Sequence, residues 1–282
     1  MSLTIFKDKT LNIAHRGASS LAPENTLSAA RKGLAVGADM WELDVQFTAD
    51  GELIVIHDAT LKRTSNSKDL FPQRRPWQVH EFTLNEIRRL DFGSWFIEQD
   101  PFGQIAAGLV TQEDLENYVG EPAPTLEQAL LFTKEHNWRV NIEIKDLSKR
   151  PGNKQIVDRV IALVEKLNMV NMVLVSSFNH EYLAQIVASY PHVLTGVLDT
   201  KPHARPVSLL RRLGARTYHP RKSFLPLADI AKLKRQGFGV NVRTVNDRKT
   251  MERLVRAGVS GIFTDFPHVL AAVITSHGKT WL

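Results

Sequence analysis

Cysteine is absent from this chain of 282 residues. Its absence excludes disulfide bonds, a thiol nucleophile and a zinc site built from thiolates. Long apolar runs are absent as well, because no stretch approaches the roughly 18 uncharged apolar residues of a transmembrane helix. The first residues, MSLTIFKDKTL, lack the basic and then apolar pattern of a secretory signal. These absences fit a reducing compartment, and we expect a cytoplasmic protein.

The chain carries more basic than acidic residues, 36 Lys and Arg against 30 Asp and Glu, for a formal net charge of +6. Such a balance favours anionic partners. The basic residues are scattered, however, and no basic stretch is interleaved with aromatic residues as in a nucleic-acid groove. We therefore expect no nucleic-acid partner. Peripheral contact with a membrane surface stays open, and no pattern indicates an oligomeric state.

Short runs rich in strand-forming residues alternate with segments of helical period, which indicates a parallel α/β sheet or barrel. Nine runs are typical of strands, at residues 11–15, 40–47, 53–57, 139–145, 172–178, 193–198, 215–219, 238–245 and 261–264. Helical patterns lie between most of them, at 27–37, 126–136, 153–167, 179–189, 225–236 and 247–257. We expect Asn25 or Thr26 to cap the first helix and Gly37 to end it. Thr125 and Gln128 have the spacing of a capping box at the second.

A (β/α)₈ barrel needs eight parallel strands, one fewer than the nine runs. The link between 40–47 and 53–57 is too short for a crossover helix, and TADG reads as a tight turn with Gly51 in a left-handed conformation. We interpret residues 40–57 as a β-hairpin whose second arm stands outside the barrel, with His57 roughly opposite Glu42. The other eight runs predict an α/β fold, a (β/α)₈ TIM barrel, in one domain over residues 1–282.

Residues 59–123 fit this alternation badly. They hold RPWQVHEF, a short helical segment LNEIRRL and a loop-like stretch DFGSWFIEQDPFG. We predict a small insertion on the rim of the barrel and not a separate domain. It follows directly after His57, where it could form one wall of a site.

Reactive side chains gather early in the chain. HRGASSLAPENT at 15–26, GADMWELDV at 37–45 and VIHD at 55–58 set out two histidines, an arginine and a Glu-x-Asp pair within 44 residues. Two imidazoles can exchange protons, two carboxylates can hold a cation, and a guanidinium fork can hold a phosphate. A single histidine is usually structural, so the hypothesis rests on the whole set, which suits the cleavage of a phosphodiester with a hard metal ion.

Residue spacing places more charge on the same side of the barrel. Functional residues of such barrels gather at the carboxyl ends of the strands, where His15 ends the first. Glu42 and Asp44 are two apart and share one face of their strand, and Glu143 and Lys145 in NIEIK repeat the spacing. Three carboxylates without cysteine or clustered histidine favour Mg²⁺ or Ca²⁺ over zinc. An alternative is that Glu143 and Lys145 only pair with each other.

These motifs resemble the glycerophosphodiester phosphodiesterase family. HRG, PENT, GAD-x-x-ELDV, DG-x-x-x-VIHD, LKRTSN, NIEIK, SSFN, TVND and GIFTDFP follow in the family order across nearly the whole chain, and only about residues 65–120 are poorly covered. The resemblance implies a (β/α)₈ barrel akin to phosphatidylinositol-specific phospholipase C. The roles it implies are one divalent cation on Glu42, Asp44 and Glu143, acid–base catalysis by His15 and His57, and phosphate binding by Arg16 and Lys145.

The reaction implied by the resemblance is hydrolysis of a small glycerophosphodiester to sn-glycerol 3-phosphate and an alcohol. One histidine would take a proton from the nucleophile, and the other would protonate the leaving alkoxide. The glycerol 2-hydroxyl could attack first and form a cyclic phosphate, or water could attack directly, and the sequence leaves both routes open.

Arg243 departs from the family, which usually carries Trp immediately before TVN. Arg243 lies in VNVRTVN, where it shares the parity of Asn241 and would face the barrel interior while Val240 and Val242 pack outward. As a third candidate for substrate binding, it would favour an anionic alcohol group over choline. The alternative is a pair with a nearby carboxylate such as Asp265.

Two other functions stay open. One is a lysophospholipase D that acts on lysophospholipids, with the insertion as a lipid-contacting lip whose candidate residues are Phe71, Trp77, Trp95 and Phe96. The other is a non-catalytic barrel that binds phosphoesters. The presence of both histidines and all three carboxylates disfavours this second alternative.

Overall fold

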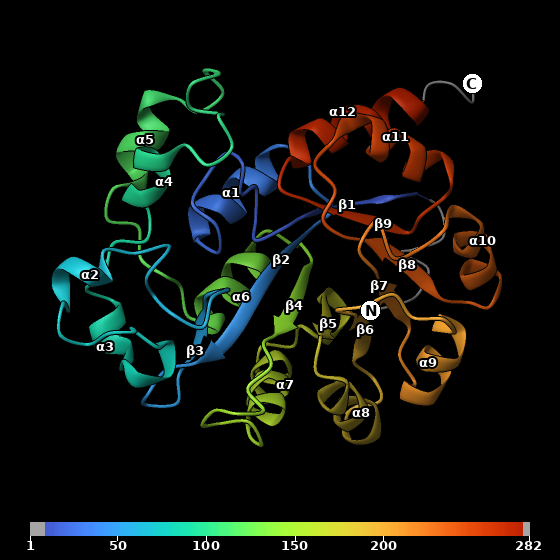
Figure 1. The fold of residues 1–282 in the computed structure, drawn as a ribbon, viewed down its shortest axis with the longest axis horizontal. Helices are drawn as coiled ribbons and strands as arrows, with labels where there is room; N and C mark the ends of the chain where they lie inside the picture. The colour runs from blue at the N-terminus through green and yellow to red at the C-terminus, as the bar shows by residue number, and fades with distance from the viewer. Residues whose placement is uncertain (1–8, 279–282) are drawn as a thin grey trace.

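Eight parallel strands close into a barrel, as the sequence predicts (Figure 1). The computed structural model describes residues 9–278, so residues 1–8, where we expect no secretory signal, lie outside the described part. The barrel order is β1-β2-β4-β5-β6-β7-β8-β9, and β9 pairs with β1 to close it. The strands are β1 (Leu11–Ala14), β2 (Met40–Phe47), β3 (Leu53–Val55), β4 (Val140–Ile144), β5 (Val173–Ser177), β6 (Leu194–Leu198), β7 (Thr217–His219), β8 (Gly239–Val242) and β9 (Gly261–Thr264).

Helices follow most barrel strands and surround the sheet (Figure 1). They are α1 (Leu27–Ala35), α6 (Leu126–Glu135), α7 (Ile156–Lys166), α8 (His180–Ser189), α9 (Pro206–Leu213), α10 (Leu227–Arg235), α11 (Arg248–Arg256) and α12 (Pro267–Gly278), with a 3₁₀ turn η3 (Val170–Met172). The predicted capping box at Thr125 is present, and Thr26, not Asn25, caps α1. The sequence pattern did not predict α9 and α12, because α9 is short and α12 is an apolar run without clear helical period.

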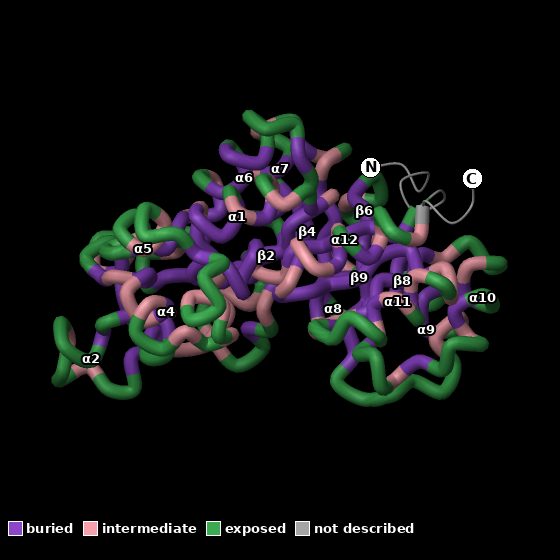
Figure 2. Tube along the Cα trace, turned by 90° about the horizontal axis from the view of Figure 1, so that it is seen from above, coloured by how far each residue is buried: buried purple, intermediate pink, exposed green. Residues whose placement is uncertain are grey.

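Alternate strand positions pack against the helices. Ile142 and Ile144 in β4, and Val240 and Val242 in β8, are buried in the apolar layer between barrel and helices, as their parity predicts. Figure 2 shows this buried material along the strands, while exposed residues concentrate in peripheral loops. Inward-facing positions of β1, β2, β5, β6 and β9 form a separate apolar cluster, which consists of Leu11, Ile13, Met40, Leu174, Leu194 and Phe263. Polar residues at the same inward parity, such as Glu42, Asp44 and Glu143, lie further along their strands.

The predicted hairpin is present. β3 pairs antiparallel with β2 outside the barrel, and Gly51 in the turn has φ 77°. The ladder ends with Val45 opposite Val55, so His57 comes just beyond it. The side chain of Gln46 donates to the carbonyls of Ile56 and Asp58, at 2.9 and 2.7 Å, and so holds the segment that carries His57.

Residues 59–123 form five short helices beside the barrel, at the left of Figure 1. They are α2 (Ser67–Leu70), the 3₁₀ turn η2 (Val79–Glu81), α3 (Leu84–Ile87), α4 (Ser94–Gln99) and α5 (Gln112–Tyr118). The stretch DFGSWFIEQDPFG is not simply loop, because it contains α4. That helix begins where the Asp91 carboxylate accepts hydrogen bonds from the N–H groups of Gly93 and Ser94, at 2.8 and 2.9 Å.

Among the described residues, no helix combines the length and the apolar character that a membrane crossing requires.

Candidate active site

A cavity of about 530 Å³ opens at the carboxyl ends of the barrel strands, a size usual for a small-molecule site. It brings together both predicted histidines and the predicted Arg16, Arg243, Glu42 and Glu143. The residues that line it are His15, Arg16, Glu42, His57, Asn141, Glu143, Ser176, Phe178, Leu198, Arg221, Lys222, Ser223, Arg243, Thr244 and Phe263.

Three buried carboxylates meet beside this cavity. Glu42 and Asp44 come from β2, and Glu143 comes from β4, where it lies in register with Asp44. One oxygen from each lies within 4.8 Å of the others. The structure therefore places the three predicted ligands of a cation together, because strand parity turns all of them to the same side.

The charges in this cluster are incompletely balanced. Burial, together with the neighbouring Asp44 and Glu143, raises the pKa of Glu42 well above its usual range. Burial acts in the same direction on Asp44, but Lys145, His57 and Arg16 outweigh it and hold the pKa of Asp44 far below its usual value. Close, buried carboxylate oxygens are the donors that Mg²⁺ and Ca²⁺ prefer, and a cation there would remove the repulsion felt by Glu42.

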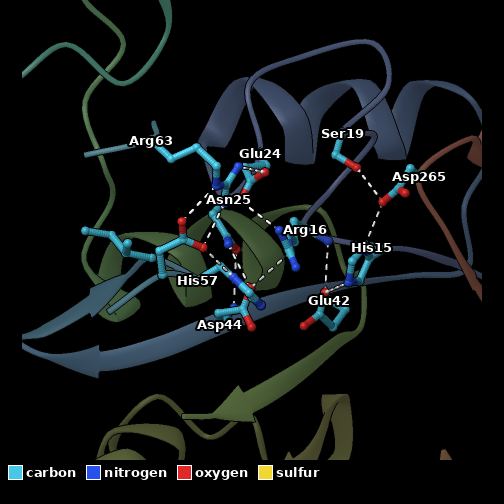
Figure 3. A network of polar contacts seen from close by, with 12 residues as sticks. His15, Arg16, Ser19, Glu24, Asn25, Glu42, Asp44, His57, Arg63 and Asp265 are labelled. Atoms are coloured by element: carbon cyan, nitrogen blue, oxygen red, sulfur yellow. Dashed lines mark hydrogen bonds and ion pairs between the residues drawn. The ribbon is translucent and has the colours of Figure 1, made fainter. Parts of the chain in front are cut away.

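His15 follows β1 and is held by a carboxylate from the other end of the chain. Its Nδ1 lies 2.6 Å from Oδ1 of Asp265, which follows β9 (Figure 3). Asp265 also accepts hydrogen bonds from Ser19 Oγ at 2.9 Å and from Asn246 Nδ2 at 2.6 Å. Although burial acts to raise it, the pKa of Asp265 is lowered to about 2, mainly by His15. The carboxylate therefore stays ionised and fixes the orientation of the imidazole.

His57 has a similar partner. Its Nδ1 lies 2.7 Å from Oδ1 of the adjacent Asp58. Arg63 donates to both oxygens of Asp58, at 2.8 and 3.0 Å, and to both oxygens of Glu24, at 2.8 Å each (Figure 3). Burial acts to raise the pKa of Asp58, but His57 and Arg63 bring it well below its usual range. The motif LKRTSN thus supplies the residue that orients the carboxylate beside His57.

Arg16 lies between the histidines, in a strained loop. Arg16 and Asn25 have φ values of 56° and 59°, a left-handed conformation that non-glycine residues rarely adopt. The Arg16 N–H donates to Glu42 Oε2 at 2.9 Å, and its guanidinium donates to Glu24 Oε1 at 2.9 Å. Its buried Nε makes no hydrogen bond and lies 3.5 Å from Asp44 Oδ2. One donor of Arg16 is therefore left for an anion.

Lys145 follows β4 and lies against the acidic cluster. Its Nζ is 2.7 Å from Glu143 Oε1 and 3.2 Å from Asp44 Oδ1. Burial acts to lower its pKa, but Asp44 and Glu143 raise it above the usual value, so the ammonium stays charged. The alternative pairing of Glu143 with Lys145 is present, and Lys145 pairs with Asp44 as well.

Arg243 follows β8 and faces the cavity, as parity predicts. It does not pair with Asp265. Its Nε donates to the carbonyl of His219 at 2.9 Å and one terminal nitrogen donates to the carbonyl of Asp199 at 2.7 Å. The guanidinium also stacks 4.5 Å from the ring centre of Phe178. The arginine is therefore held in place by backbone and by an aromatic ring.

Several residues that hold the site were not predicted as part of it. Asn25 donates from Nδ2 to Asp44 Oδ2 at 2.9 Å, and its Oδ1 accepts the Asp44 N–H at 3.2 Å, so it orients a carboxylate and does not cap α1. Glu24, Asp58, Arg63 and Asp265 act in the same supporting way. They lie in the motifs PENT, VIHD, LKRTSN and GIFTDFP, which were the only sequence signal for them.

Comparisons with known proteins agree with this geometry. The profile of the Glycerophosphoryl diester phosphodiesterase family matches residues 15–269. A glycerophosphodiester phosphodiesterase of Caldanaerobacter subterraneus is 35% identical over 271 residues, which cover 96% of this chain and 100% of the relative. One of Bacillus subtilis is 32% identical, over 94% of this chain and 87% of the relative. A phosphodiesterase structure from Oleispira antarctica superposes with a TM-score of 0.81 at 24% identity, over 98% and 100% of the two chains.

The fold and the site define a (β/α)₈-barrel enzyme with its polar centre at the strand ends. Because the family profile and relatives above 30% identity span almost the whole chain, it belongs to the glycerophosphoryl diester phosphodiesterase family. The predicted resemblance is confirmed, and the chain is an enzyme of the phosphodiesterase class. The family uses a divalent metal, which the buried acidic cluster could hold.

Proposed function

We propose that this chain hydrolyses glycerophosphodiesters to sn-glycerol 3-phosphate and an alcohol, with His15 and His57 moving the protons. One observation carries the proposal. Two imidazoles, each bound through Nδ1 to a carboxylate, stand on either side of the acidic cluster in one cavity (Figure 3). The Oleispira antarctica relative was solved with sn-glycerol 3-phosphate as its product, which supports the same product here.

The partners of the histidines determine which ring nitrogen can react. An ionised carboxylate only accepts hydrogen bonds, so Asp265 and Asp58 require the Nδ1 of each histidine to carry its hydrogen. In the neutral form of either ring, Nε2 is then the free base, and in the charged form it is the acid. One histidine can take a proton from the attacking hydroxyl while the other protonates the leaving alkoxide.

Cationic groups would bind the substrate phosphate. Arg16 has an unsatisfied buried Nε, and Lys145 carries a charged ammonium beside the cluster. Glu42, Asp44 and Glu143 would hold one divalent cation, Mg²⁺ or Ca²⁺, which would supply further positive charge to the phosphate oxygens. Negative charge builds up on the phosphate oxygens as the nucleophile attacks. Cations that are already in place next to these oxygens therefore lower the activation barrier of the reaction.

The alternative lysophospholipase D has less support. Trp77 and Phe96 are buried, and Phe71 and Trp95 are half-buried against small apolar clusters. They pack the insertion internally, so they form no apolar lip for an acyl chain. The single-domain organisation and the cytoplasmic location stay predictions.

The test is turnover of glycerophosphocholine against lysophosphatidylcholine, with and without a chelator. We expect cleavage of the glycerophosphodiester, loss of activity with chelator, and recovery with Mg²⁺ or Ca²⁺. His15→Ala and His57→Ala should each lower turnover by roughly 10²–10⁴-fold while the protein stays folded, the range for losing a general acid or base. Tight binding of both compounds without turnover would instead support the non-catalytic binding barrel.

A further inference from the structure

Basic residues form the wall of the cavity that lies beyond β7 and β8. Arg221, Lys222 and Ser223 follow β7, Arg243 follows β8, and all four line the same cavity as His15 and the acidic cluster. The backbones of the two segments are tied together, because Lys222 N–H donates to the Arg243 carbonyl at 3.1 Å and Arg243 N–H donates to the Pro220 carbonyl at 2.9 Å. We call Arg221 and Arg243 the arginine pair.

The arginine pair lacks a carboxylate partner. Lys222 is neutralised by Asp247, with Nζ 3.0 Å from Oδ2. Among residues 9–278, however, no carboxylate oxygen lies within 4 Å of a side-chain nitrogen of Arg221 or Arg243. Arg243 makes its hydrogen bonds with two backbone carbonyls, and the Arg221 guanidinium lies 5.8 Å from the ring centre of Phe224. The carbonyls orient Arg243 without cancelling its charge.

The charges in this part of the cavity repel each other. Burial lowers the pKa of Arg243, and Arg221 lowers it further, while Glu143, Glu42 and, least, Asp199 act in the opposite direction. Those two glutamates belong to the acidic cluster and would be taken up by the divalent cation of the proposed function. A free anion near the arginine pair would relieve this repulsion.

We propose that Arg221 and Arg243 form a subsite for a second anionic group, a carboxylate or a phosphate, on the alcohol part of the substrate. The proposal rests on the proposed function. The glycerol part of a glycerophosphodiester carries only neutral hydroxyls, so the second charge must belong to the alcohol. The scissile phosphate already has Arg16, Lys145 and the cation. Guanidinium groups match the planar or forked oxygens of carboxylates and phosphates better than any other side chain.

The test uses two pairs of substrates that differ only by an anionic group. Glycerophosphoserine differs from glycerophosphoethanolamine by one carboxylate. Glycerophosphoglycerol with a terminal phosphate differs from glycerophosphoglycerol by that phosphate. We expect the native enzyme to have the higher kcat/KM for the more anionic member of at least one pair. Arg221→Gln and Arg243→Gln should each reduce that preference about tenfold, as expected for one charge-assisted contact.

Arg253→Gln serves as the matched control, because Arg253 is exposed on α11 and its loss changes the net charge equally. The preference should persist in this variant. We expect Arg221→Gln to fold even if Arg243→Gln does not, because the Arg221 side chain makes no hydrogen bond in the described part of the chain. A native preference of about one in both pairs, or one that survives both arginine variants, overturns the subsite. Failure to cleave any of the four substrates overturns the proposed function instead.

Discussion

At the scale of single residues, two carboxylates orient the proposed catalytic histidines. Asp265 reaches His15 from the strand that closes the barrel, while Asp58 is the neighbour of His57 and is held by Arg63. Both carboxylates have a lowered pKa, so each accepts the Nδ1 hydrogen throughout the neutral pH range. Neither needs to touch the substrate, and each acts by fixing the tautomer and the angle of a ring.

Asp265→Asn tests this positioning role. The amide of Asn can donate to Nδ1 of His15, which favours the tautomer with its hydrogen on Nε2 and removes the free base. We expect kcat/KM to fall by about 10²–10⁴-fold with little change in KM, because the group acts through His15. The measurement is steady-state kinetics on glycerophosphocholine, with circular dichroism to confirm folding.

Asp229→Asn is the matched control, since Asp229 is half-buried on α10, far from His15 and His57 in the sequence, and loses the same charge. If Asp265→Asn kept native kcat and pH profile, Asp265 would only support the loop structurally.

At the scale of elements, β2 and β4 form the acidic cluster through their register. Asp44 lies beside Glu143 and Glu42 beside Asn141, so a shift of β2 by one residue would turn Glu42 and Asp44 out of the barrel and away from Glu143. A cation that binds these carboxylates in the folded chain stabilises it, because the unfolded chain does not keep them together.

We therefore expect Mg²⁺ or Ca²⁺ to raise the thermal midpoint of the native protein. At an ion concentration about 100 times its Kd, the gain in unfolding free energy is about 2.7 kcal/mol. Glu143→Gln should lose most of this gain, while Glu127→Gln, a change on α6 at a half-exposed side chain that pairs with Lys166, should keep it. Thermal melts with ion and then with chelator measure both. An equal gain in all three proteins would place the cation elsewhere.

The loop between β1 and α1 also depends on one glycine. Gly17 has φ 81°, and a Cβ there would lie 2.6 Å from the backbone of Ala29 in α1. Gly17→Ala should therefore lower the free energy of unfolding by more than the roughly 1–3 kcal/mol of a strained dihedral alone, and should displace His15 and Arg16.

Gly51→Ala separates the cost of the strained dihedral from the cost of the contact with Ala29. Gly51 has a similar φ of 77°, but nothing lies within 4 Å of the added Cβ. Urea unfolding of both variants should show the smaller loss for Gly51→Ala, and only Gly17→Ala should lose activity. If both variants lost the same free energy of unfolding, the contact of the added Cβ with α1 would not destabilise the fold.

At the scale of the whole molecule, the barrel encloses a histidine that must stay neutral. His219 in β7 is fully buried, with Nε2 2.9 Å from Thr217 Oγ1, and burial together with Arg243 lowers its pKa to about 3. In the unfolded chain its pKa is about 6.5. Below about 6.5 the unfolded state therefore binds a proton that the folded state does not, and stability decreases as the pH falls towards about 3.

His219→Gln should weaken this dependence. Between pH 6 and pH 4 the native protein should lose about 1.4 kcal/mol per pH unit through this group, and the variant should not. Urea unfolding at pH 7, 6, 5 and 4 gives the slope of the unfolding free energy against pH. A loss of packing in the variant lowers this free energy equally at every pH and leaves the slope unchanged. His203→Gln, at an exposed position, should keep the native slope. Identical slopes in His219→Gln and the native protein would contradict the buried neutral form.

The sequence by itself determined the features that depend on near neighbours. Residue spacing along a strand has a period of two, so Glu42, Asp44, Glu143 and Arg243 could be assigned to the barrel interior before the barrel was known. The TADG turn and the capping box at Thr125 are equally local. The order of the motifs along the chain was enough to indicate the family. HRG, VIHD and NIEIK also each lie at the end of a strand.

The tertiary structure decided which distant groups meet. Asp265 reaches His15 across 250 residues only because β9 pairs with β1. Arg243 binds the carbonyls of Asp199 and His219, and not the carboxylate of Asp265, because the ends of β6 and β7 stand beside it. The local pattern predicts which face of a strand a side chain lies on. The residue that this side chain contacts depends on closure of the barrel, which no short stretch of sequence encodes.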